Sequence, residues 1–191
     1  VDVDRIGCDF LSMTGRKYLR GPRGTGFLYA RRATTAHIEP VFLDNHAAKW
    51  TDDNAYTVRD DARRFENWER YFAGVIGLKV AADQANELGM VPIWARLREL
   101  ADGLRRRLAT VKGVTLTDLG EVKGAIVTFA VAGADHVALR DKLRAQAINV
   151  TVSTQFSSRL DLKGRGLINV MRASVHVYNT EEELDRFVAA L

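Results

Sequence analysis

Cysteine is almost absent from this 191-residue sequence, which contains a single thiol, Cys8. One thiol cannot form an internal disulfide, and it cannot supply a zinc site built only from cysteines. His37 and His46 have no metal-ligand partners at a plausible spacing, and we expect no metal site. The scarcity of cysteine fits a reducing compartment, and we expect the cytoplasm.

Long apolar runs are also missing. No stretch approaches the roughly 20 consecutive apolar residues that span a bilayer, so we expect no membrane partner. A hydrophobic share of 47% is still enough for a real core. No charged-then-apolar leader is visible, and the opening Val-Asp-Val-Asp, without an initiator Met, suggests a piece of a longer protein.

The net charge of +4 is only mildly basic. Many of the arginines are dispersed over residues 96–107, in a segment with helical periodicity, which is typical of a solvated face. Basic runs interleaved with stacking aromatic residues are absent, so we expect no nucleic-acid partner.

The pattern predicts two domains, residues 1–88 and residues 89–191. The first begins with a predicted strand at 6–13 and a glycine-rich loop at 14–24. The rest of it is predicted as a second strand at 26–30, an irregular excursion at 34–62 and a helix at 68–88.

The second domain is predicted as a compact α+β module. Pro92 is suited to the first turn of a long helix. That helix carries one apolar stripe at Ile93, Leu97, Leu100, Leu104, Leu108 and Val111. Strands are expected at 114–116, 125–131, 148–153 and 167–178, and a helix at 135–147. Thr180 and Glu183 form the capping box of a terminal helix.

Lys17 is the residue best placed for chemistry. It follows a strand in a glycine-rich loop and is flanked by Thr14 and Arg16. A lysine in a desolvated pocket beside another cation has a lowered pKa, which suits Schiff-base formation. A hydroxyl and a guanidinium can hold a phosphate. A solvated basic loop would have the same spacing, so that alternative stays open.

The glycine-rich run at residues 21–26 does not fit a nucleotide loop. It lacks the Gly-Lys-Ser/Thr ending, and it leads into a predicted strand rather than a helix. The helix N-terminus that attracts phosphate is therefore missing.

Three ordered motifs resemble the class V aminotransferases, a family of pyridoxal-phosphate (PLP) enzymes. The first is CDFLSMTGRK followed by GPRGTGFLY, at residues 8–17 and 21–29. The others are RFE at residues 64–66 and RASVHVYNT at residues 172–180. The family includes cysteine desulfurases, isopenicillin N epimerase-like proteins and a sulfoxide C–S lyase. The resemblance implies an α/β chain, the end of a PLP-dependent transferase large domain followed by a small α+β domain.

The resemblance assigns a role to four residues. Lys17 is similar to the lysine that forms the Schiff base with PLP, and Thr14 to the residue that binds the PLP phosphate. Arg16 stands where many relatives have histidine, and it could also serve the phosphate. Arg172 resembles the arginine that clamps the substrate α-carboxylate, a task suited to its bidentate geometry. Alternatively, Arg172 is a strand residue paired with an internal acid.

Further positions depart from the family pattern or carry weaker expectations. Asn67-Trp68-Glu69 replaces the usual Gly-Thr pair after RFE, where a partner subunit contacts the phosphate. The resemblance implies a homodimer. His176 could line the site, but we expect it to pack beneath the last helix. We expect His37 and His46 to be surface or rim residues.

The absence of a cysteine from one loop reduces the number of reactions that we expect. Cysteine desulfurases need a mobile-loop cysteine to accept sulfur as a persulfide, and the matching region, residues 151–162, has none. We therefore expect an amino-acid enzyme that catalyses transamination, epimerisation or C–S β-elimination, and not a persulfide-forming desulfurase.

The alternative is a truncated, non-catalytic module. The aromatic residue that stacks on PLP and the aspartate that pairs with its ring nitrogen lie upstream of the lysine strand in this fold type. Neither has a place in the 16 residues before Lys17, which suggests the C-terminal half of a longer enzyme.

Overall fold

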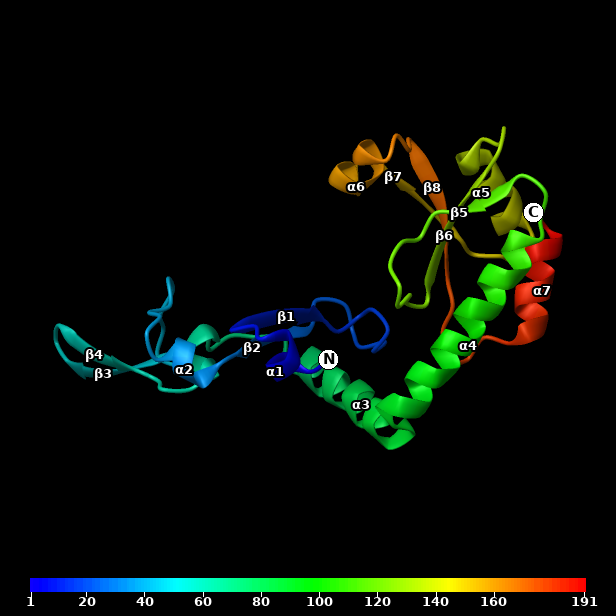
Figure 1. Ribbon diagram of the computed structural model, residues 1–191. Coiled ribbons are helices and arrows are strands. Elements are labelled where there is room, and N and C mark those ends of the chain that lie inside the picture. Colours follow the sequence, from blue (N-terminus) through cyan, green and yellow to red (C-terminus); the bar gives the residue numbers. More distant parts are fainter. The chain divides into compact units, whose positions relative to one another are not determined.

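A computed structural model describes residues 1–191 as two compact units, Val1–Glu87 and Leu88–Leu191 (Figure 1). None of the helices is both long and apolar enough to cross a membrane.

The first unit is built around an antiparallel hairpin. Strand β1 (Phe10–Thr14) pairs with β2 (Gly26–Ala30), so that Thr14 lies opposite Gly26. The unit also contains α2 (Arg32–Thr35), the 3₁₀ turn η1 (Ala62–Phe65) and α3 (Phe72–Leu88). The second strand matches its prediction.

The first strand begins later than the sequence predicts. Val3–Ile6 form a helical turn, α1, because the Asp2 carboxylate caps the backbone N–H groups of Asp4 and Arg5. Gly7 ends this turn at a φ of 71°, which favours glycine. The prediction of a strand from Ile6 was therefore wrong by four residues.

A second hairpin lies within the excursion predicted to be irregular. Strands β3 (Ala48–Asp52) and β4 (Ala55–Val58) pair with Trp50 opposite Tyr56. Both aromatic side chains are exposed, and neither face of the hairpin is buried over its length. Without a buried face, the sequence lacks the apolar alternation by which strands are recognised.

The second unit contains a four-stranded antiparallel sheet in the order β5-β6-β8-β7. Its strands are β5 (Val114–Leu116), β6 (Ile126–Val131), β7 (Thr151–Thr154) and β8 (Asn169–Ser174). Helices α4 (Met90–Ala109) and α7 (Glu181–Ala189) pack against one another, and α5 (His136–Ala145) contacts β7 and β8 (Figure 1).

One face of this sheet forms the core. Val127 and Phe129 of β6 and Met171 and Ala173 of β8 are buried among the helices. The ring of Phe129 meets Phe187 of α7 edge-on at 6.1 Å. The predicted helical stripe is confirmed in α4, where four leucines are buried: Leu97, Leu100, Leu104 and Leu108.

The terminal helix, α7, begins with the predicted capping box. The Thr180 hydroxyl accepts from the Glu183 N–H, and the Glu183 carboxylate accepts from the Thr180 N–H. A short helix, α6 (Arg159–Gly164), was not predicted, because it buries only Leu162 and has no apolar stripe.

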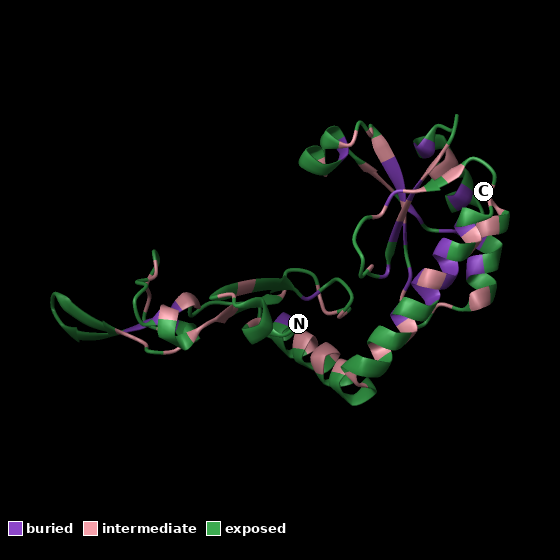
Figure 2. Ribbon diagram, in the orientation of Figure 1, coloured by how far each residue is buried: buried purple, intermediate pink, exposed green.

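The first unit has no comparable core. Its ribbon is coloured mostly as exposed in Figure 2. Its buried apolar residues are only Ala47 and Ala48, whereas Phe27, Leu28 and Ile76 are exposed. The large core cluster belongs entirely to the second unit. The stability of this chain therefore resides mainly in residues 88–191.

Leu104→Ala tests where the core lies. Leu104 is 1% exposed, so its truncation should lower the unfolding free energy of the second unit by about 3 kcal/mol. Leu119, which is 68% exposed, provides the control, since Leu119→Ala should change this free energy by less than about 0.5 kcal/mol. Urea unfolding followed by the amide signals of β8 measures both; equal losses would contradict this description of the core.

Candidate active-site residues

Thr14, Arg16 and Lys17 lie together at one end of the β1–β2 hairpin. Thr14 is the last residue of β1, and Arg16 and Lys17 follow in the turn. All three side chains are exposed. The structure thus brings three of the four predicted site residues to one loop.

The backbone of this loop is tied closely to itself. The Gly15 N–H donates to the Thr25 carbonyl, and the Gly21 N–H donates to the Gly15 carbonyl, each at 2.8 Å. A Cβ on Gly15 would come within 2.6 Å of a Leu78 methyl carbon, and one on Gly26 would lie 2.1 Å from the Met13 carbonyl oxygen. Only glycine permits this tight closure, which holds Lys17 in a defined turn.

The charges of the loop are all of one sign. Residues 14–24 contain Arg16, Lys17, Arg20 and Arg23 and no acidic residue. Arg20 donates to the side-chain carbonyl of Gln84 on α3 at 3.0 Å. Lys17 is exposed in the first unit. This unit therefore does not by itself supply the desolvated pocket that lowers the pKa of a lysine. The basic side chains of the loop are nevertheless suited to an anionic ligand, and the amine of Lys17 is suited to an electrophilic group on the same ligand.

Arg172 lies in the second unit, in the middle of β8. Met171 and Ala173 point into the core, so the alternation of the strand places Arg172 on the opposite face of the sheet. Its side chain is half-buried, and its Nε is buried without a hydrogen-bond partner. No carboxylate forms an ion pair with Arg172, so the alternative of an internal acid is wrong.

The RFE segment is held by a network of charged groups. The Glu66 carboxylate accepts from Arg70 Nη1 at 2.7 Å and lies 3.1 Å from His46 Nε2. His46 is therefore half-buried and partnered, whereas His37 is exposed; the sequence predicts surface or rim positions for both. The Phe65 ring meets Phe10 of β1 edge-on at 5.9 Å. The Phe65–Phe10 contact joins this segment to the first hairpin, and the Glu66 contacts join it to His46 and Arg70.

Asp44 binds Trp68, one of the three residues that stand where the resemblance leads one to expect a Gly-Thr pair. Its carboxylate accepts from the backbone N–H groups of Trp68, His46 and Ala47 at 2.7, 2.8 and 3.1 Å. These hydrogen bonds, that of Trp68 foremost, hold the pKa of the Asp44 carboxyl below its ordinary value of 3.8. Asn67-Trp68-Glu69 thus has a structural contact within the chain.

The pH dependence of this contact can be measured. Because the Asp44 pKa is lowered in the folded state, its contribution to stability is present above pH 3.8 and is lost as the pH falls through the lowered pKa. The NMR shift of the Trp68 amide should therefore titrate with a midpoint below 3.8. In Asp44→Asn this transition should vanish. A wild-type midpoint at or above the ordinary value would refute the assignment.

His176 stacks on Tyr178, with ring centroids 4.6 Å apart and an interplanar angle of 17°. Its Nδ1 accepts from the Val177 N–H at 2.9 Å. The ring is half-buried, and the expected packing beneath the last helix stays a prediction.

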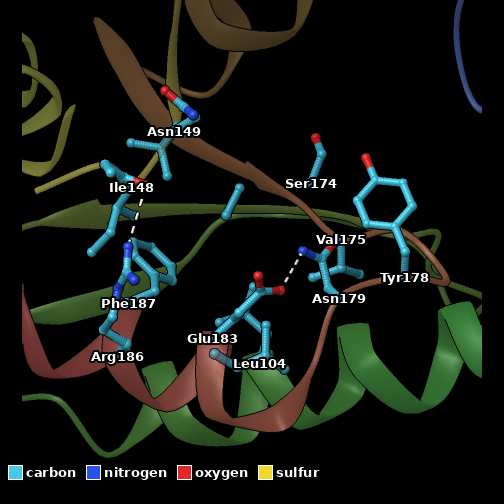
Figure 3. A pocket seen from close by; sticks show the side chains of 14 residues that line it. Leu104, Ile148, Asn149, Ser174, Val175, Tyr178, Asn179, Glu183, Arg186 and Phe187 are labelled. Carbon is cyan, nitrogen blue, oxygen red and sulfur yellow. Dashed lines mark hydrogen bonds between the residues drawn. The ribbon is translucent and has the colours of Figure 1, made fainter.

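A cavity of about 340 Å³ lies beside the start of α7 (Figure 3). Its charged groups already have partners. Glu183 accepts from Asn179 Nδ2 at 2.8 Å, and Arg186 donates to the carbonyls of Gln146 and Ala147. Arg172 does not line the cavity. We therefore regard it as a cleft beside the helix cap rather than as a site of chemistry. The structure also contains no cluster of side chains that could hold a metal ion.

Known proteins resemble the chain over its full length. The family model "Aminotransferase class-V" matches residues 1–187. A "Probable cysteine desulfurase" from Xylella fastidiosa (strain 9a5c) is 35% identical over 192 residues, which cover 100% of this chain and 45% of that protein. A "Cysteine desulfurase" from Yersinia pestis (strain Pestoides F) is 32% identical and covers 100% of the chain and 47% of that protein.

Solved structures agree with these sequence matches. The cysteine desulfurase CsdA from Escherichia coli superposes with a TM-score of 0.88 at 25% identity, covering 99% of this chain and 46% of that one. The apo cysteine desulfurase from Thermococcus onnurineus NA1 gives a TM-score of 0.89 at 25% identity, covering 98% and 47%. The chain has the mixed α/β fold of these PLP-dependent enzymes and spans about 45% of the length of the curated relatives.

These matches correct one expectation. The missing cysteine in residues 151–162 led us to exclude a persulfide-forming desulfurase, but the relatives that match the whole chain are named cysteine desulfurases. The exclusion was wrong because one position in one loop is a poor guide to subfamily. The similarity to the desulfurases is carried by residues spread over both units.

Proposed function

Because the chain belongs to the class V aminotransferase family, we propose that it forms part of a PLP-dependent enzyme that removes sulfur from cysteine. The observation that supports this most directly is the acid-free loop that presents Lys17 between Thr14 and β2. In this proposal the first unit is the end of the PLP-binding large domain, and the second unit is the small domain. Since the chain spans only about 45% of its relatives, the activity is assigned to the whole protein.

The donor groups of the hairpin fit PLP. This cofactor has an aldehyde and a phosphate, and the loop offers an amine, a hydroxyl and a guanidinium within four residues. Lys17 would hold the cofactor covalently, while Thr14 and Arg16 would hold its phosphate. When bound, PLP supplies an electron sink that stabilises negative charge at the substrate Cα.

Lys17 would also act as the base. Its Nζ would take the proton from the substrate Cα and return a proton later. Its position in a closed turn, tied by Gly15 and Gly21, limits the movement of the backbone that carries it. Such fixed placement is what proton transfer over a hydrogen-bond distance requires.

Arg172 would bind the substrate α-carboxylate. It has no acid of its own in the chain, so its guanidinium is available for a carboxylate from outside.

The cysteine sulfur would then pass to an acceptor thiol. The Cβ–S bond would break and an S–S bond would form, so that R–SH and cysteine become R–S–SH and alanine.

We further propose a homodimer in the cytoplasm. The exposed apolar side chains of the first unit, including Phe27, Trp50 and Tyr56, support burial against another polypeptide surface. The single thiol supports a reducing compartment.

Borohydride reduction tests the role of Lys17. The whole protein is incubated with PLP and then reduced. It should carry one label, which peptide mass should locate at Lys17. Lys17→Ala should lose the label, whereas Lys79→Ala should keep it, because Lys79 is an exposed lysine of α3 paired with Asp83. In the presence of L-cysteine and dithiothreitol, the wild-type protein should form alanine and sulfide in equal amounts. A trapped label elsewhere than Lys17 would reject the assignment.

Arg172→Lys tests the carboxylate clamp. Lysine keeps the charge but loses the fork of two parallel N–H donors, so KM for L-cysteine should rise by about tenfold, the equivalent of one charge-assisted hydrogen bond. The rate with cysteamine, which lacks the carboxylate, should not change. An unaltered KM and kcat/KM for L-cysteine would remove Arg172 from the substrate site.

A further inference from the structure

Arg172 lies in a row of side chains that crosses three strands. It pairs with Thr128 of β6 on one side and with Thr151 of β7 on the other. Directly opposed residues in an antiparallel sheet point to the same face, with Cβ atoms about 5 Å apart. Thr128, Arg172 and Thr151 therefore form a row of two hydroxyls flanking one guanidinium on the face away from the helices.

The two threonines are not equivalent. Thr128 is half-buried, and its Oγ1 accepts a hydrogen bond of 2.9 Å from the hydroxyl of buried Thr117. A hydroxyl that accepts in this way can still donate its own proton. Thr151 is exposed and has no side-chain hydrogen bond. The Thr128 hydroxyl is thus a donor beside Arg172 whose orientation is fixed by Thr117, whereas the Thr151 hydroxyl can rotate.

Thr117 is itself held from both sides. Its N–H donates to the Thr128 carbonyl at 2.8 Å, and its carbonyl accepts from Arg165 Nη2 at 2.5 Å. The neighbouring Asp118 forms an ion pair with buried Arg105 of α4 at 2.7 Å. These contacts fix Thr117, and Thr117 in turn orients the Thr128 hydroxyl.

Arg172 needs an acceptor that the chain does not provide. A buried N–H without an acceptor is unfavourable, and Arg172 Nε is in that state. The row around it holds two hydroxyls and no carboxylate, and neither hydroxyl oxygen accepts a hydrogen bond from Arg172 Nε. A planar carboxylate would satisfy both the guanidinium and the adjacent hydroxyls.

We infer that Thr128 is a second carboxylate-binding residue, that Thr117 positions its hydroxyl, and that Thr151 contributes a weaker contact. This inference rests on the proposed function, because the natural ligand would be the α-carboxylate of the amino-acid substrate. It extends the site from one arginine to a three-residue row.

The test needs neither cofactor nor turnover. Propionate is titrated into the 191-residue chain at constant ionic strength, with chloride as the balancing anion, and the Arg172 Nε–H resonance is followed by NMR. Thr128→Val removes the hydroxyl and keeps the shape, so the Kd for propionate should rise by about five- to tenfold. Thr128→Ser should stay near the wild-type Kd, and Thr151→Val should raise it by less than Thr128→Val.

Thr115→Val is the matched control. Thr115 is an exposed threonine of β5 that pairs with Ala130 rather than with the row, so its loss should leave the Kd unchanged. Thr117→Val should weaken binding in the wild-type background and have no effect in Thr128→Val, because it acts through Thr128.

Three results would overturn the inference: a wild-type resonance that does not move with propionate, an equal shift with chloride alone, or a Thr128→Val Kd equal to that of the wild type. If Thr128→Val does not fold, Thr117→Val and Thr151→Val decide by the same criterion. The proposed function fails separately, by the absence of a PLP label on Lys17 or of alanine from cysteine, and the propionate titration does not depend on either.

Discussion

The burial of one face of the C-terminal sheet is the constraint on which the rest of the second unit depends. Met171 and Ala173 must pack against the helices, because the core cluster is centred on them and on Phe129. In a strand with a side-chain period of two, this burial forces Arg172 to the other face. The same alternation in β6 places Thr128 beside it. The candidate carboxylate site is therefore a direct consequence of core packing.

The first unit follows a different principle. Its hairpin is held by backbone hydrogen bonds and by glycines that allow close approach, not by a buried core. A loop fixed in this way can present Lys17, Thr14 and Arg16 without burying them. The remaining walls of a cofactor pocket would have to come from surfaces outside this unit, and its exposed apolar side chains are suited to such contacts.

The sequence predicts the parts of this molecule that carry local signals. The apolar stripe of α4, the capping box at Thr180 and the strand at 26–30 all follow from spacing within a few residues. The hairpin at 48–58 was missed because it has no buried face, and α6 was missed because it buries a single leucine.

The candidate site depends on local signals in the same way. Lys17, Thr14, Arg16 and Arg172 belong to contiguous motifs, so a resemblance could nominate them as candidates. Thr128 and Thr151 are far from Arg172 in the sequence, and only the register of β6, β8 and β7 brings them to it. The missing cysteine shows the opposite error, in which one local absence was given more weight than similarity over the whole chain.

The most direct test is a crystal structure of the protein with PLP and 3-mercaptopropionate. This ligand has the thiol and carboxylate of cysteine but no amine, so it cannot displace Lys17 from the cofactor. We predict a covalent bond from Lys17 Nζ to PLP, and the ligand carboxylate within hydrogen-bond distance of the Arg172 guanidinium and the Thr128 hydroxyl. Cofactor bonded to another lysine, or a carboxylate bound away from Arg172, would contradict the account.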